Sequence, residues 1–187
     1  MRLFVALDFP DSVREEIRGL IARLRPHARG ARWARPEGMH VTLKFVGQVE
    51  PKRLDAIAAA LALVRSNAPV DMRFRGLGFF PSDRRPRVLW CGIEASANLA
   101  PLAADIERAV EPLGIPPETR DFVPHLTLAR FDSPRAAGKL AEIAAQMQSI
   151  DLGSARESVF HLYESVTKPS GAEYSRLRSF PFVKDAA

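Results

Sequence analysis

The stretch His40-Val41-Thr42-Leu43 has a counterpart later in the chain, His125-Leu126-Thr127-Leu128. Both are rich in β-branched and aliphatic residues, which favours a β-strand. Successive side chains of a strand point to opposite faces, so each copy places its histidine and threonine on one face and its aliphatic pair on the other. We therefore expect two strands that bury aliphatic residues and each present one imidazole beside one hydroxyl.

The two copies belong to a longer internal repeat. His40 and His125 are 85 residues apart, and the same offset relates the strand expected from Arg2 to one expected from Arg87. The strand expected around Met72 is related in the same way to one around Glu157. The sequence predicts a single bilobal domain over 1–187, with copies at about 2–86 and 87–171 and a closing strand at about 172–182.

Helices and strands alternate along the predicted chain. The first helix opens with Asp11 or Ser12 as N-cap and ends before Pro26. Further helices are expected at about 51–65, 97–113 and 134–148, and the loop at 27–38 is basic. Besides the two His-x-Thr strands, the second at about 123–131, strands are expected at about 2–8, 70–80, 87–94, 156–166 and 173–180, the last two joined by a turn at 168–171. Hairpins favour antiparallel pairing. We expect an α+β fold with two pseudo-twofold-related lobes, each a small, mainly antiparallel sheet with outer helices, and an active site in the central cleft.

Composition narrows the classes of partner. The net charge of +5 and pI of about 9.9 favour an anionic partner such as a nucleotide or RNA. There is no apolar run long enough to span a membrane. The single cysteine, Cys91, excludes an internal disulfide and suits the reducing cytoplasm, and its strand-like surroundings predict a buried, inert thiol. We also expect a monomer.

The candidate catalytic residues are His40 and His125. Imidazole suits chemistry that needs an acid and a base near neutral pH, and Thr42 and Thr127 could donate hydroxyl hydrogen bonds to a phosphate. The other two histidines, His27 and His161, lack the threonine and receive no role.

Weaker candidates surround these four residues. By alternation Lys44 shares the face of His40 and could reach a phosphate, whereas Arg130 shares the face of His125 only if the strand bends. Trp33, in the basic loop, is a candidate for stacking on a base, and Phe45 is expected in the core. No carboxylate or cysteine cluster completes a metal site, so neither a metal nor another cofactor is expected.

These motifs resemble a known group of enzymes. Arg32 through Glu37, His40 through Gly47 and Pro124 through Arg130 resemble the two-histidine (2H) phosphoesterase superfamily. Within it, the whole chain is similar to the bacterial and archaeal RNA 2′,3′-cyclic phosphodiesterases, also called 2′-5′ RNA ligases.

The resemblance implies metal-independent hydrolysis of an RNA 2′,3′-cyclic phosphate to a 2′-phosphate, with His40 as proton donor and His125 as proton acceptor. The substrates it implies are RNA ends, including tRNA fragments or nucleotides, and the reverse reaction would form a 2′-5′ bond. Sequence alone does not fix which histidine is the acid. Two alternatives stay open, a phosphodiesterase for a small cyclic nucleotide and a non-catalytic module that binds nucleotides or RNA.

Overall fold

The computed structural model describes residues 1–169 and 171–182. Ser170, in the predicted turn, and residues 183–187, at the end of the predicted domain, lie outside the described residues. The strands are β1 (Arg2–Leu7), β2 (Arg32–Trp33), β3 (Val41–Gln48), β4 (Val70–Phe80), β5 (Val88–Ala95), β6 (His125–Arg130), β7 (Asp151–Glu157), β8 (Val159–Lys168) and β9 (Gly171–Pro181). The α-helices are α1 (Asp11–Leu24), α2 (Leu54–Leu61), α3 (Leu99–Val110) and α4 (Leu140–Gln146).

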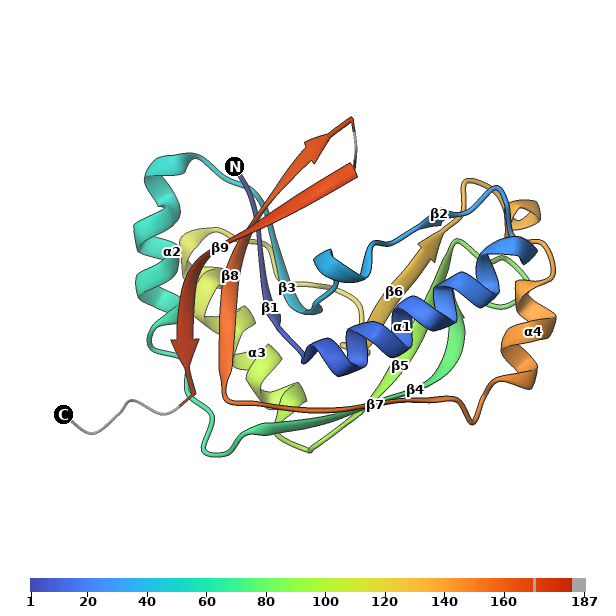
Figure 1. Cartoon of the computed structure of the whole chain (residues 1–187). Coiled ribbons are helices and arrows are strands. Elements are labelled where there is room, and N and C mark those ends of the chain that lie inside the picture. The colour runs from blue at the N-terminus through green and yellow to red at the C-terminus, as the bar shows by residue number, and fades with distance from the viewer. Residues whose placement is uncertain (170, 183–187) are drawn as a thin grey trace.

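Two antiparallel sheets form the two lobes (Figure 1). The four-stranded sheet has the order β3-β1-β8-β9, and the five-stranded sheet has the order β2-β6-β5-β4-β7. Helices α2 and α3 cover the first sheet, whereas α1 and α4 cover the second. The predicted α+β fold with antiparallel sheets and outer helices is confirmed.

Each sheet takes strands from both halves of the chain. Strand β4 lies in the first half but pairs with β5, while β8 lies in the second half and pairs with β1. One continuous cluster of buried apolar side chains accordingly contains residues of both sheets, such as Val41 and Leu89. Neither half of the sequence therefore builds a sheet alone, and the two lobes share one core.

The first helix follows the predicted apolar pattern but not the predicted cap. Val13, Ile17, Leu20, Ile21 and Leu24 are all buried. Burial of each such side chain stabilises the fold by about 1.5–3 kcal/mol. The expectation that Asp11 or Ser12 caps the helix is wrong, because Pro10 holds the N-cap position and no side chain caps the first turn.

Three other boundaries differ from the prediction. Helix α2 is shorter than expected, since Pro51–Arg53 forms a separate 3₁₀ turn and the helix ends at Leu61. The helix expected over 134–148 is divided because Gly138, with φ of 56°, interrupts it. The strand expected over 156–166 is two strands that leave Ser158 between the sheets; β7 was missed because its mostly exposed residues do not alternate.

The basic loop and the single cysteine can also be compared with their predictions. The loop at 27–38 contains the short edge strand β2, which pairs with β6. Cys91 is buried as predicted, and burial raises the pKa of its thiol to about 12, which makes it unreactive. None of the helices in the described part of the chain is long and apolar enough to cross a membrane.

Candidate active site

The two histidines and two threonines line one cleft between the sheets. His40 directly precedes β3 and Thr42 lies on it, while His125 and Thr127 lie on β6. The aliphatic neighbours, among them Val41 and Leu126, are buried on the opposite faces. The four predicted side chains therefore line the same cleft, and strand alternation explains why each histidine shares a face with its threonine.

Both imidazole rings are held by the backbone that precedes them. The Nδ1 atom of His125 lies 2.8 Å from the carbonyl oxygen of Val123, two residues earlier. His40 has the corresponding hydrogen bond with the backbone of Gly38, also two residues earlier. Because the Val123 carbonyl can only accept, His125 carries its proton on Nδ1, which leaves Nε2 for chemistry.

Aromatic rings enclose His40. Phe4 stacks on the imidazole with ring centroids 4.3 Å apart, and Tyr163 lies nearly parallel at 5.8 Å. Tyr174, on β9, meets the same ring edge-on at 5.0 Å. Burial in this cluster lowers the pKa of His40 to about 4, because a charged imidazolium loses its hydration. Sequence reasoning missed these three aromatic residues, which come from strands distant in the sequence.

His125 has a less enclosed position. Phe80 meets its ring edge-on, with centroids 4.9 Å apart. Burial is the main cause that lowers the pKa of His125, and the positive charges of Arg130 and Arg120 add to it, while the hydrogen bond with the Val123 carbonyl opposes it. Both histidines therefore favour the neutral form in the free protein.

Each His-x-Thr strand contains a bulge just after its threonine. In β3, Thr42 lies opposite Ala6 but Lys44 lies opposite Val5, so Leu43 is an extra residue. Strand β6 repeats this at Leu128, between partners of Trp90 and Leu89. A bulge reverses the alternation of the residues that directly follow it.

The bulge overturns two expectations about β3. The expectation that Lys44 shares the face of His40 is wrong, because its side chain is only 3% exposed and points to helix α3. There its Nζ atom lies 2.6 Å from Glu107 Oε2 and 2.7 Å from the carbonyl oxygen of Pro116. A phosphate-binding role for Lys44 is therefore not supported. Phe45, expected in the core, is 57% exposed and neighbours Phe4 on the cleft side.

The equivalent bulge in β6 places Arg130 on the cleft face of the strand, where simple alternation would not have placed it. Arg130 is exposed, lines the cleft and lies on the same face as Thr127. From the sequence, Arg130 was expected to share the face of His125 only if the strand bends. The bulge at Leu128 is that bend.

Trp33 lines the cleft from the short edge strand β2. It pairs opposite Ala129 in the β2–β6 ladder and packs, half-buried, against the main core. Its indole Nε1 is buried and finds no hydrogen-bond partner in the part of the chain that the structure describes. Stacking of Trp33 on a base stays a prediction.

With this geometry established, the chain can be compared with known proteins. The sequence model of the LigT like phosphoesterase family matches residues 7–90 and, again, residues 93–174. The chain belongs to this family. An RNA 2′,3′-cyclic phosphodiesterase of Methanothermobacter thermautotrophicus is 33% identical over 181 residues, which cover 96% of this chain and 98% of the relative. The enzyme of the same name from Archaeoglobus fulgidus is 34% identical over 180 residues, covering 96% and 99% of the two chains.

Two solved structures share the fold. The crystal structure of TT0787 from Thermus thermophilus has a TM-score of 0.79 at 32% identity and covers 97% of this chain and 98% of that chain. Escherichia coli LigT, crystallised with 3′-AMP, has a TM-score of 0.77 at 24% identity, with 98% of both chains covered. This second likeness establishes the fold alone.

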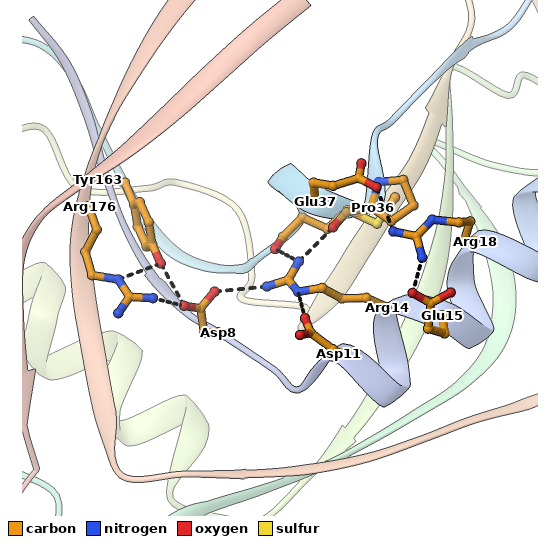
Figure 2. Close-up of polar contacts among 10 residues, drawn as sticks. Asp8, Asp11, Arg14, Glu15, Arg18, Pro36, Glu37, Tyr163 and Arg176 are labelled. Carbon is orange, nitrogen blue, oxygen red and sulfur yellow. Dashed lines mark hydrogen bonds and ion pairs between the residues drawn. The ribbon is translucent and has the colours of Figure 1, made fainter.

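A polar network supports the loop before His40 in this LigT-like protein (Figure 2). Asp8 is its centre: its Oδ2 atom accepts a hydrogen bond of 3.0 Å from Tyr163 and also pairs with Arg176, and Oδ1 lies 3.2 Å from Arg14. Arg14 in turn donates to the carbonyl oxygen of Pro36 at 2.7 Å. The network joins β1, α1, β8 and β9 to the loop that carries His40.

Metal ligands do not gather at this phosphoesterase site. Among residues 1–169 and 171–182, no three His, Cys, Asp or Glu side chains lie together in a way that could hold a metal ion. What the arrangement offers instead is two imidazoles, two hydroxyls and nearby guanidinium groups around one cleft.

Proposed function

We propose that this protein hydrolyses the 2′,3′-cyclic phosphate at the end of an RNA chain to a 2′-phosphomonoester, with His40 as proton donor, His125 as proton acceptor and no metal ion. Membership of the LigT-like family and relatives named RNA 2′,3′-cyclic phosphodiesterase support hydrolysis of a cyclic phosphodiester. The observation that carries the assignment is the pair of backbone-held imidazoles that face one cleft.

The reaction needs two proton transfers at one phosphorus atom. A water molecule must lose a proton as its oxygen bonds to phosphorus, and the 3′-oxygen must gain a proton as its bond to phosphorus breaks. Neutral His125 takes the first proton at Nε2, and protonated His40 supplies the second. Before the next substrate reacts, His125 releases its proton to solvent and His40 takes one up. This exchange restores the starting protonation state of each histidine.

The assignment requires that His40 be protonated when it acts. Its lowered pKa leaves little imidazolium in the free protein at neutral pH. A bound phosphate carries negative charge, which favours the charged form of a neighbouring imidazole and so raises its pKa. Substrate binding therefore favours the protonated form of His40 that the reaction needs. The choice of His40 as donor and His125 as acceptor follows the usual assignment in the family.

Hydroxyl groups stabilise the charge that develops on the phosphoryl oxygens. Thr42 and Thr127 each lie on the same face of a strand as a catalytic histidine and donate to these oxygens. Donors fixed in advance by a rigid strand stabilise a transition state without reorganising. The reverse reaction, which joins the cyclic phosphate to a 5′-hydroxyl as a 2′-5′ bond, uses the same two histidines because each step is microscopically reversible.

Mass spectrometry of a defined substrate tests the proposal. An RNA oligonucleotide with a 2′,3′-cyclic phosphate end is incubated with the protein and EDTA, beside the variants His40→Ala and His125→Ala. We expect the wild type to add one water and leave the phosphate on the 2′ oxygen, and both variants to lose at least a hundredfold in rate, as for removal of a general acid or base.

An exposed histidine provides the matched control. His27 lies outside the cleft, so His27→Ala should retain wild-type activity. Near-full activity of either cleft variant would refute the two-histidine mechanism. Loss of activity in EDTA that returns with a divalent cation would refute metal independence.

A further inference from the structure

Three arginines meet at one corner of the five-stranded sheet. Arg32 on β2 pairs directly opposite Arg130 on β6, and Arg130 is also opposite Val88 on β5. Arg87 precedes Val88, and its carbonyl oxygen accepts a hydrogen bond of 2.9 Å from the N–H of Phe131. We call Arg32, Arg87 and Arg130 the arginine corner; all three are exposed and line the cleft.

The positive charge of this corner is only partly balanced. Like charges directly opposite in an antiparallel pair are destabilising, and Arg32 faces Arg130 in this way. One carboxylate is nearby, that of Asp132, whose Oδ1 lies 2.8 Å from Arg32. Arg87 donates instead to the backbone carbonyl of Asp132. Within the described ranges, neither Arg87 nor Arg130 has a carboxylate partner, so the corner carries a surplus of positive charge.

Several other cations that line the cleft are paired with acids. Arg14 and Arg176 share Asp8, Arg18 pairs with Glu15 and Glu37, and Arg120 pairs with Glu118. The contrast makes the corner a place where an anion from outside would relieve repulsion. The exposed turn before it adds Arg84 and Arg85.

The corner is displaced from the catalytic residues along the same strand. Arg130 follows Thr127 by three positions, and at about 3.3 Å per residue this places their Cα atoms on the order of 10 Å apart. Arg130 ends β6 whereas His125 begins it, so the corner lies at the other end of this strand from His125. This position suits a phosphate other than the cyclic one.

We propose that the arginine corner binds the phosphodiester backbone of the RNA upstream of its cyclic end. This inference rests on the proposed function and adds to it a second binding site, which holds the RNA chain apart from its cyclic end. Guanidinium groups match phosphate oxygens in bidentate geometry, and such contacts fix the position of the chain without reading its sequence.

Fluorescence anisotropy with labelled single-stranded RNA of four nucleotides and a 2′-phosphate end tests this directly, at several salt concentrations. We compare the wild type with Arg32→Gln/Arg87→Gln and with the charge-conserving Arg32→Lys/Arg87→Lys. The glutamine variant should bind at least tenfold more weakly, and its salt slope should fall by about 1.4, since each phosphate contact to a single strand contributes roughly 0.7. The lysine variant should retain most of the affinity.

Kinetics with two substrates form the second arm. The ratio of kcat/KM for a tetranucleotide cyclic phosphate to that for a 2′,3′-cyclic mononucleotide should fall at least fivefold in the glutamine variant. Arg156→Gln is the control, because Arg156 is exposed and paired with Asp71 outside the cleft. It should leave both affinity and ratio unchanged, and thermal melts of all variants check folding.

The outcomes separate the two proposals. Unchanged RNA affinity and salt slope in the glutamine variant would overturn the arginine corner, even if the wild type hydrolyses both substrates. Weaker, less salt-dependent binding supports the corner even if the wild type hydrolyses neither substrate, a result that would refute the proposed function alone.

Discussion

Arg14 Nη1 donates a hydrogen bond of 2.9 Å to the carbonyl oxygen of Met39, the residue directly before His40. The same atom donates to the carbonyl of Pro36, so one guanidinium group of helix α1 fixes both sides of the Gly38 peptide that orients the His40 ring. We predict that Arg14→Gln lowers kcat about tenfold or more while KM changes less than threefold, because a small displacement of an acid weakens catalysis more than binding. Steady-state kinetics with a cyclic phosphate substrate measures both constants.

Arg18, one turn later on α1, supplies the matched control for Arg14. Its partners Glu15 and Glu37 are exposed, and exposed ion pairs contribute little. Arg18→Gln should therefore retain kcat. If Arg14→Gln and Arg18→Gln lower kcat equally, or if Arg14→Gln raises KM alone, Arg14 does not position His40. The pH profile of kcat should also shift in Arg14→Gln and not in Arg18→Gln.

The enclosed ring of His40 should make stability depend on pH. Burial lowers its pKa from 6.5 to about 4, so the unfolded chain binds the proton more readily than the folded one. The contribution of neutral His40 to the free energy of unfolding is complete above pH 6.5. It is lost as the pH falls from 6.5 towards 4, by ~3 kcal/mol in all. Urea unfolding at pH 7.5 and pH 4.5 should show that His40→Asn loses less free energy of unfolding than the wild type. His27→Asn, at an exposed position, should behave as the wild type does; equal losses in all three proteins would contradict a buried His40.

The lowered pKa values of His40 and His125 also predict an acidic optimum for the free enzyme. The profile of kcat/KM against pH reports the free enzyme, which needs one neutral and one protonated imidazole. Because both pKa values lie below 6.5, kcat/KM should pass through a maximum below pH 6.5 and decline on both sides. The profile of kcat should lie at higher pH, since bound phosphate favours the imidazolium. A kcat/KM that still rises between pH 7 and 8 would refute this assignment of the two limbs.

Local alternation was enough to predict the centre of the site. His40 with Thr42, and His125 with Thr127, share a face because two-residue spacing on a strand is independent of the rest of the fold. The buried face of α1 was predicted for a similar reason, since its apolar residues follow the period of a helix. These features depend on interactions between residues close in the sequence.

Features set by distant partners were not predictable in this way. The bulges at Leu43 and Leu128 arise from pairing with β1 and β5, and no signal in either stretch marks the extra residue. One such residue moved Lys44 into the protein and Phe45 out of it. Tyr174 reaches His40 only because β9 pairs with β8 at the edge of the same sheet, which no local pattern reveals.

The buried ion pair of Lys44 leads to a last prediction, on stability. The Lys44 side chain is 3% exposed and that of Glu107 is 24% exposed, and the Lys44 ammonium also holds the Pro116 carbonyl of the loop that leads towards His125. Lys44→Met removes one partner and leaves a largely buried carboxylate, which should reduce the free energy of unfolding by about 3 kcal/mol.

The double variant Lys44→Met/Glu107→Leu should recover part of the loss from Lys44→Met, because an apolar pair of similar volume needs no hydration. Lys52→Met, which breaks the exposed pair with Glu50, should change stability by no more than about 0.5 kcal/mol. Urea unfolding of the wild type and the three variants decides the matter. If Lys44→Met is as stable as Lys52→Met, the ammonium of Lys44 faces water. That result would support the expectation that Lys44 reaches the cleft.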